Sequence, residues 1–214
     1  MPYRYAFFDL DGTLIDSAPG IFNSARYALK KLGFPPPTQE QLNAFIGPPL
    51  YRSFMEHCGF SRTDAEHGID LFREYYAEHG ISECRLFDGI PALLEELTHR
   101  GVVCALATCK PHVFAKQLLQ THGLAPYFSC VSGPEIDGTR GEKQEVIEDA
   151  MKRLGIDTPA EVLMIGDRDN DVLGAARLGI DCAGALWGFG SREELLCAGA
   201  KYLCEEPKEV ARCI

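Results

Sequence analysis

Two aspartates that follow a short apolar run near the start of this 214-residue chain constrain its fold and chemistry most strongly. The apolar run is Tyr5 to Phe8, and Asp9 and Asp11 come next with one residue between them. Side chains at i and i+2 point to the same face of a strand, so both carboxylates are expected at the end of one buried strand. Their mutual repulsion favours a cation between them. Gly12 then permits a tight turn whose N–H can approach an anion.

The composition narrows the classes of protein and of ligand. Hydrophobic residues make up 46% of the chain and charged ones 24%, as in ordinary globular proteins, and the length suits one domain or a domain with a smaller insert. A net charge of −10 argues against a nucleic acid polymer as a partner. It is compatible with a small phosphorylated substrate, because a bound cation reverses the local field. No apolar run reaches membrane-spanning length, and the first residues do not resemble a signal peptide.

The nine cysteines do not form a recognisable metal or redox motif. They include no CxxC pair and no Cys/His cluster with zinc spacing. Cys104, Cys130 and Cys182 lie in apolar runs, where a free cysteine behaves as a small hydrophobic residue. Since no export signal is evident, we expect reduced thiols and a cytoplasmic protein.

The chain changes character after the first strand. Residues 16–82 show helical periodicity and no strand pattern, which predicts about four helices, over 17–33, 38–45, up to 57, and 61–80. Beyond them strands and helices alternate. Strands are predicted over 102–107, 128–132, 162–165 and, as the last strand, 182–187; helices are predicted over 91–101, 111–123, 142–154 and 171–178, and after Ser191. Continuous apolar strands separated by helices indicate a parallel sheet covered on both faces.

Polar residues gather where the predicted strands end, which is where ligands bind in such sheets. Thr108 to Lys110 follow the strand over 102–107, and Gly166 to Asp171 follow the strand over 162–165. Lys143 begins a helix between them. The N–H groups of Cys109 and Lys110 are expected at a helix start, where anions bind readily. Asp169 is expected to face solvent.

These residues together resemble the four motifs of the haloacid dehalogenase (HAD) superfamily of phosphohydrolases. The motifs are Asp9-x-Asp11-Gly12-Thr13, Thr108, Lys143 and Gly166-Asp167-x-x-x-Asp171, in the order and spacing of that superfamily. The resemblance implies an α/β fold. It consists of a Rossmannoid core over 1–15 and 83–214, with a central parallel sheet flanked by helices, and an inserted all-helical cap over 16–82.

The resemblance also implies a mechanism. Asp9 is the expected nucleophile, which forms an aspartyl-phosphate, and Asp11 is the expected general acid and base. Mg²⁺ is expected on Asp9, Asp167, the backbone carbonyl of Asp11, and Asp171 as a second ligand or as an orienter of water. The phosphoryl oxygens are expected to contact Gly12, Thr13, Thr108, Cys109, Lys110 and Lys143.

A closer match is to the branch that contains phosphoglycolate phosphatases and 5′-nucleotidase-like enzymes, carried by residues 45–50, 107–111, 166–168 and 186–191. Cys109 stands where that branch usually has serine. The cap segment 45–52 includes Gly47, Tyr51 and Arg52, which we expect to contact the substrate. Its aromatic and proline surface favours a nucleoside 5′-monophosphate as the substrate. Phosphoglycolate is the alternative substrate, because the guanidinium of Arg52 pairs well with a carboxylate. For the oligomeric state, a monomer and a homodimer are both compatible with the sequence.

Several alternatives follow from the same residues. A dehalogenase has no need of Asp11 or of Mg²⁺ ligands, while a sugar phosphatase or a phosphomutase of the superfamily shares all four motifs. A non-enzymatic receiver module combines Asp, Thr and Lys, but its phosphorylated Asp lies on a later strand and it lacks a helical insert. The Cys109 thiol, beside an anion site and Lys110, is expected either to have a lowered pKa and to be sensitive to oxidation or to be inert and packed.

Overall fold

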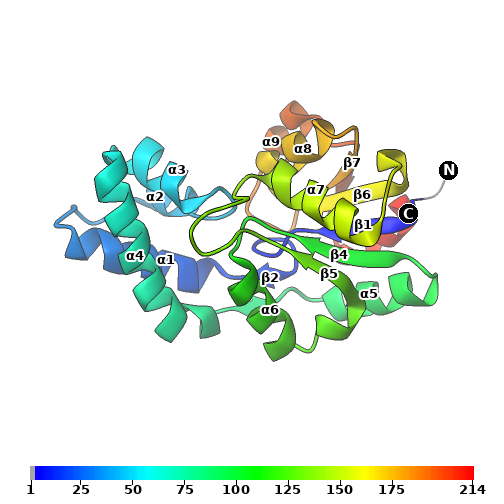
Figure 1. Ribbon diagram of the computed structural model, residues 1–214, viewed down its shortest axis with the longest axis horizontal. Helices are drawn as coiled ribbons and strands as arrows, with labels where there is room; N and C mark the ends of the chain where they lie inside the picture. Colours follow the sequence, from blue (N-terminus) through cyan, green and yellow to red (C-terminus); the bar gives the residue numbers. More distant parts are fainter. Residues whose placement is uncertain (1–2) are drawn as a thin grey trace. The chain divides into compact units, whose positions relative to one another are not determined.

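The computed structural model describes residues 3–214 (Figure 1). Contacts divide the chain into two compact units. The first consists of the chain up to Ile15 and of Leu86–Ile214, and it holds the main sheet. The second, Asp16–Arg85, is the insert unit. The predicted cap boundary at residue 82 stays a prediction.

A parallel sheet forms the centre of the first unit and confirms the predicted α/β fold. Within residues 3–214 it has six strands in the order β5-β4-β1-β6-β7-β8. Their bounds are β1 (Tyr5–Phe8), β4 (Val103–Ala107), β5 (Phe128–Ser132), β6 (Val162–Gly166), β7 (Asp181–Ala185) and β8 (Tyr202–Cys204). The prediction that the strand over 182–187 is the last was wrong. β8 has only three residues and is too short to produce a recognisable apolar run.

Helices cover both faces of this sheet. Figure 1 shows α7 and α8 on one side and α5 and α6 on the other. The helices of this unit are α5 (Ile90–His99), α6 (His112–Thr121), α7 (Lys143–Leu154), α8 (Asp169–Ala176), α9 (Arg192–Ala198) and α10 (Val210–Cys213), with 3₁₀ turns at Ala125–Tyr127, Pro159–Glu161 and Pro207–Glu209. Because side chains alternate along a strand, Phe7 of β1 packs into the core beneath α7 and α8, with Val146 and Val172.

Local signals in the sequence set the helix ends that matter for the site. Glu142 forms a capping box with Glu145, so α7 begins at Lys143, and Gly155 ends it in the left-handed conformation. The predicted start of the helix at Asp171 was wrong. The backbone N–H of Arg168 donates to Asp171 Oδ2 at 3.1 Å, and α8 begins at Asp169 instead.

The insert unit is built from helices around an aromatic core. It contains α1 (Ala18–Lys31), α2 (Gln39–Asn43), α3 (Leu50–Arg52), a π-helical turn (Ser53–His57), α4 (Arg62–Glu78) and a 3₁₀ turn (Gly80–Ser82). Thr38 and Gln41 form a capping box at the start of α2, within the helix predicted over 38–45. Phe45 packs edge-on against Phe54 and stacks parallel to Phe72.

A second, short sheet lies where the chain passes between the two units. It pairs β2 (Ile15–Asp16) with β3 (Arg85–Leu86). The expectation of no strand over 16–82 was therefore wrong at Asp16. Two-residue strands carry no periodicity that a sequence pattern could reveal.

Among the described residues, the helices all lack the length and the apolar character that crossing a membrane requires.

Candidate active site

Three buried carboxylates meet at the carboxyl end of the main sheet. Asp9 directly follows β1, Asp167 directly follows β6, and Asp171 lies in the first turn of α8. Since β1 and β6 are adjacent and parallel, their ends bring these residues together. One oxygen from each carboxylate lies within 4.8 Å of the others, and the three residues are 4%, 0% and 1% exposed.

Lys143 is the ammonium group within this cluster. Its Nζ lies 2.6 Å from Asp9 Oδ1 and 2.6 Å from Asp171 Oδ1, and it donates to the carbonyl of Ala107 at 3.1 Å. Burial alone would lower the pKa of Lys143, but Asp171 and Asp9 raise it well above its usual value. The side chain therefore stays charged beside Asp9 and Asp171.

The cluster has more negative charge than Lys143 balances. Burial raises the pKa of Asp9 to about 6, with the attraction of Lys143 acting against that rise. Burial and the charges of Asp171 and Asp9 raise the pKa of Asp167 well above its usual value. A bound cation would offset both the cost of burying the charged carboxylates and their mutual repulsion. An oxygen-only donor set of this kind fits Mg²⁺.

Both oxygens of Asp167 are held by donors from the protein. Thr13 Oγ1 donates to Oδ1 at 3.2 Å, and the N–H of Phe189 donates to Oδ2 at 2.8 Å. Gly12 has φ +85°, and a Cβ there would lie 2.2 Å from Oδ2 of Asp167, so only glycine fits. Thr13, predicted to contact phosphate, is thus bonded to Asp167. The sequence did not identify Phe189, because its contact depends on β7 lying beside β6.

Asp11 lies outside the three-carboxylate cluster and pairs with a second buried lysine. Lys110 Nζ lies 2.7 Å from Asp11 Oδ2 and 3.0 Å from Oδ1. The N–H of Lys110 donates to Thr108 Oγ1 at 3.2 Å. The sequence assigned Lys110 to phosphate and did not anticipate its pairing with Asp11. Adjacent ends of β1 and β4 explain the contact.

Cys109 does not have the lowered pKa that was one of the two expectations. Burial raises the pKa of its thiol to about 12, and the nearby Lys143 offsets only part of that effect. Asn170 Nδ2 lies 4.0 Å from the sulfur. The expectation of a lowered pKa is wrong, because the thiol is desolvated. The alternative, an inert packed thiol, agrees with this environment.

The sequence also predicted substrate contacts from the insert and a solvent-facing Asp169. Gly47, Tyr51 and Arg52 belong to the insert unit, where Arg52 Nε donates to Tyr51 Oη at 3.3 Å. Their contact with a substrate stays a prediction. Asp169 was expected to face solvent; it is half-buried, and its N–H donates to Glu194 Oε1 at 3.0 Å.

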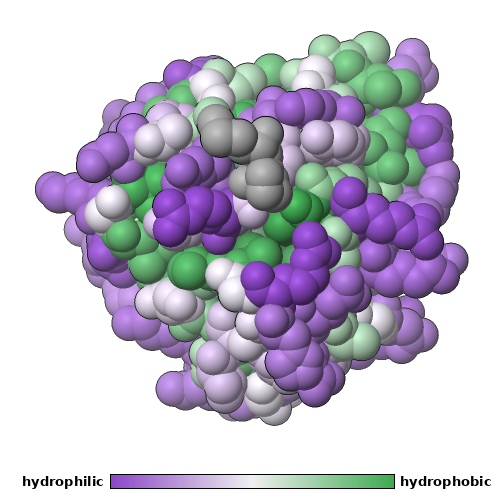
Figure 2. Space-filling model, turned by 90° about the vertical axis from the view of Figure 1, so that its right-hand side faces the viewer, coloured by the Kyte–Doolittle hydropathy of each residue, from purple (hydrophilic) through white to green (hydrophobic). Residues whose placement is uncertain are grey.

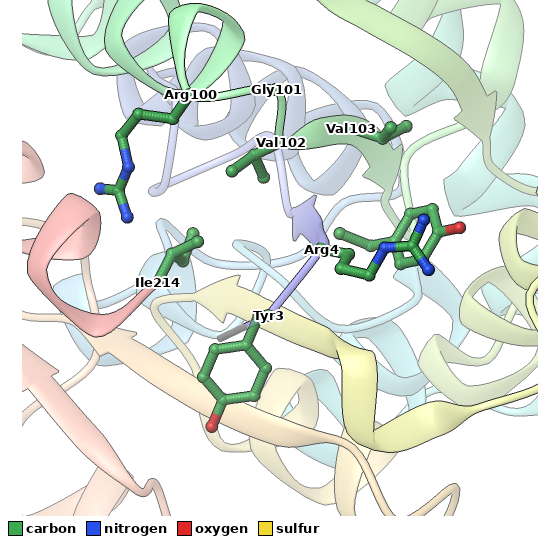
Figure 3. Close-up of a pocket in the computed structure, with 8 residues that line it drawn as sticks. Tyr3, Arg4, Arg100, Gly101, Val102, Val103 and Ile214 are labelled. Atoms are coloured by element: carbon green, nitrogen blue, oxygen red, sulfur yellow. The ribbon is translucent and has the colours of Figure 1, made fainter. Parts of the chain in front are cut away.

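A cavity of about 260 Å³ lies at the opposite, amino end of β1 and β4 (Figure 3). Val102 and Ile214 point into it, and Arg4 and Arg100 lie at its sides. Figure 2 views the protein from the side that carries this end of the sheet, and hydrophobic residues show there among hydrophilic ones. The residues that line the cavity include none of the predicted site residues. The carboxylate cluster is therefore the candidate active site.

Comparison with known proteins agrees with this geometry. Residues 6–185 match the family of haloacid dehalogenase-like hydrolases. The chain belongs to this family. The match extends from β1 to the last residue of β7, so it includes the three carboxylates and both buried lysines.

Individual relatives of the chain within the family carry phosphatase names. A 5′-nucleotidase from Pseudomonas aeruginosa is 41% identical over 204 residues, which cover 95% of this chain and 92% of that protein. A phosphoglycolate phosphatase from Vibrio parahaemolyticus is 30% identical, with the same coverage of 95% and 92%. The crystal structure of a predicted phosphatase from Clostridium acetobutylicum is 42% identical, with a TM-score of 0.95 and coverage of 99% and 98%. The prediction of a phosphatase of this family is confirmed.

Proposed function

We propose that this chain is a Mg²⁺-dependent enzyme that hydrolyses a small phosphomonoester through an aspartyl-phosphate on Asp9. The observation that supports this most strongly is the buried cluster of Asp9, Asp167 and Asp171 around the single ammonium of Lys143. The nucleophile Asp9 thereby lies 2.6 Å from a fixed positive charge on Lys143, and one of its oxygens lies within 4.8 Å of oxygens of Asp167 and Asp171, which with it form a cation site. These are the parts that phosphoryl transfer requires.

The metal would be held by Asp9, Asp167 and the backbone carbonyl of Asp11, with Asp171 as a further ligand or as an orienter of bound water. When bound, it would neutralise the phosphoryl oxygens and reduce their repulsion from Asp9. Thr13 and Phe189 fix the oxygens of Asp167, so the ligand is oriented before the metal arrives.

The side chains then carry the two chemical steps. Asp9 attacks phosphorus in line, while Asp11 protonates the leaving oxygen and afterwards accepts a proton from the attacking water. Lys143 and Thr108 stabilise the charge on the equatorial oxygens, together with the backbone N–H groups of Cys109 and Lys110. The side chain of Lys110 holds the carboxylate of Asp11 in a defined orientation.

We further propose that the leaving group is a nucleoside. The relative named 5′-nucleotidase, at 41% identity, supports this choice. Tyr51, which is 43% exposed, offers a flat surface on which a base can stack. Phosphoglycolate is the second candidate, because another relative carries that name and because Arg52 can pair with a carboxylate.

A substrate panel tests the proposal. We would measure kcat/KM with Mg²⁺ for several 5′-nucleotides, phosphoglycolate and small sugar phosphates, on the wild type and on Arg52→Ala. The proposal expects a 5′-nucleotide to have the highest kcat/KM. A lead of tenfold or more for phosphoglycolate that Arg52→Ala abolishes would show that the nucleotidase assignment is wrong. Phosphate transfer to a second sugar, without release of phosphate, would indicate a mutase instead.

A further inference from the structure

Asp167 lies between two segments that follow the neighbouring strands. Strand β6, which precedes Asp167, has β1 on one side and β7 on the other. Gly12 and Thr13 follow β1, and residues 186–191 follow β7; we call this second stretch the 186–191 segment. Each contributes one donor to Asp167, namely the hydroxyl of Thr13 and the N–H of Phe189.

Trp187 connects these two segments directly. Its indole Nε1 donates to the carbonyl oxygen of Thr13 at 2.9 Å. The bond runs from the segment after β7 to the segment after β1, over the end of the intervening strand β6. The two segments that supply the donors of Asp167 are therefore connected by the side chain of Trp187.

Two glycines bring the 186–191 segment against Asp167. A Cβ at Gly188 would lie 2.3 Å from Cβ of Asp167 and 2.5 Å from the carbonyl oxygen of Gly12. A Cβ at Gly190 would lie 1.9 Å from the carbonyl oxygen of Asp167. Neither position has room for a side chain. Because the segment packs directly against Asp167, a small displacement of the segment would move Asp167 as well.

We propose that Trp187 is a positioning residue for the cation site, acting on Asp167 through Thr13 and Phe189. The inference rests on the proposed function, in which Asp167 is a ligand of Mg²⁺. Without the indole N–H, the carbonyl of the buried Thr13 loses a donor, and the segments after β1 and β7 can separate. The two donors of Asp167 then lose their common alignment, and the carboxylate can rotate. Groups that hydrogen-bond a metal ligand directly, as Thr13 and Phe189 do here, typically contribute about 10- to 100-fold to metal affinity, and Trp187 aligns both of them.

Trp187 is also the single tryptophan of the sequence. Its fluorescence therefore reports on this one position, with no correction for other tryptophans. If the indole is bonded to the segment that carries Gly12 and Thr13, cation binding beside Asp167 alters its surroundings. The emission of the wild-type protein should change during a Mg²⁺ titration.

The test compares Trp187→Phe with Tyr3→Phe. Both substitutions keep an aromatic ring and remove one donor, but Tyr3 Oη donates to Asp181 at the amino end of the sheet, at 2.7 Å. Calorimetric titration with Mg²⁺ alone should give a Kd about tenfold higher or more for Trp187→Phe and an unchanged Kd for Tyr3→Phe. Phosphate release by Trp187→Phe should recover as the Mg²⁺ concentration rises. The recovery is measured well below the unfolding temperature of the metal-free variant, so that stabilisation of the fold by Mg²⁺ cannot produce it.

The outcomes separate the inference from the proposed function. Wild-type protein that binds no Mg²⁺ would overturn the proposed cation site and the inference with it. Wild-type binding together with an equal Kd for Trp187→Phe would overturn the inference alone. If Trp187→Phe does not fold, the wild-type fluorescence decides. A change in emission with the calorimetric midpoint supports the inference, and unchanged emission at saturating Mg²⁺ overturns it.

Discussion

The two ends of the main sheet carry polar clusters made from similar residues in opposite environments. At the amino end, Lys201 Nζ pairs with Asp181 Oδ2 at 2.7 Å and lies 3.0 Å from Tyr3 Oη. These two charged side chains are 48% and 39% exposed. At the carboxyl end, Lys143 forms pairs of almost the same length with Asp9 and Asp171, but all three side chains are at most 5% exposed.

The difference shows that burial and charge balance, and not residue type, mark the chemical site. The amino-end cluster has one carboxylate for one ammonium, and water screens the pair, so such pairs add little. The carboxyl-end cluster has three carboxylates for one ammonium, all desolvated. Burying unbalanced charge is costly, so we expect it to persist where a bound cation and chemistry use it. The predictions below test that contrast.

Asp9→Asn should have the largest effect. It removes the proposed nucleophile while preserving size, so turnover should fall by roughly 10⁴–10⁶-fold. The fold should be retained, because an amide is less costly to bury than a carboxylate. Steady-state phosphate release and thermal unfolding measure the two effects. A variant with a tenth of wild-type activity would refute the assignment of Asp9.

Lys143→Met and Lys201→Met test the contrast between the two ends directly. Without Lys143, Asp9 and Asp171 lose their buried ammonium, and the metal-free protein should be destabilised by about 3–5 kcal/mol. Activity should fall by roughly 10²–10³-fold. Lys201→Met should leave activity unchanged. Chemical denaturation and phosphate release on both variants give the comparison, and equal losses would mean that the two clusters do not differ in role.

Lys110→Met should have an intermediate effect on the rate. Asp11 keeps its place but loses the ammonium that contacts both of its oxygens. We expect kcat to fall by roughly 10- to 100-fold, below the 10²–10⁴ that a complete general acid–base group contributes. The Kd for Mg²⁺ should change less than in the Trp187→Phe variant. Unchanged kcat with a raised KM would instead assign Lys110 to substrate binding.

Cys109→Ser should have the smallest effect. The thiol is desolvated, and burial raises its pKa to about 12, so little thiolate exists at neutral pH. Peroxide should inactivate the wild type and Cys109→Ser at the same rate, with similar kcat before treatment. Faster inactivation of the wild type would restore the hypothesis of a redox-sensitive Cys109.

Much of the fold could be predicted because each long element carries its own signal. The apolar run over 162–165 and the capping residues Glu142 and Ser191 mark elements that the structure contains. The misses have a common physical reason. β2 and β8 have two and three residues, and their pairing depends on partners far away in the sequence.

The residues of the candidate site could be predicted from the sequence, but not all of the contacts between them. Asp9, Asp167, Asp171 and Lys143 each follow or begin a predicted element, and the structure brings them together. The pairing of Lys110 with Asp11 and the bond from Trp187 to Thr13 were not predictable. Both contacts depend on the order of the strands in the sheet, which local periodicity does not specify.

Trapping of a phosphorylated protein tests the central claim most directly, namely that the charged end of the sheet transfers a phosphoryl group to Asp9. The enzyme would be mixed with Mg²⁺ and substrate and quenched in acid within one turnover, and the modified residue would be located by mass spectrometry. The account predicts one phosphoryl group on Asp9 in the wild type, and none without Mg²⁺ or in Asp9→Asn. Single-turnover phosphate release with no phosphorylated protein, or a phosphoryl group on another residue, would contradict it.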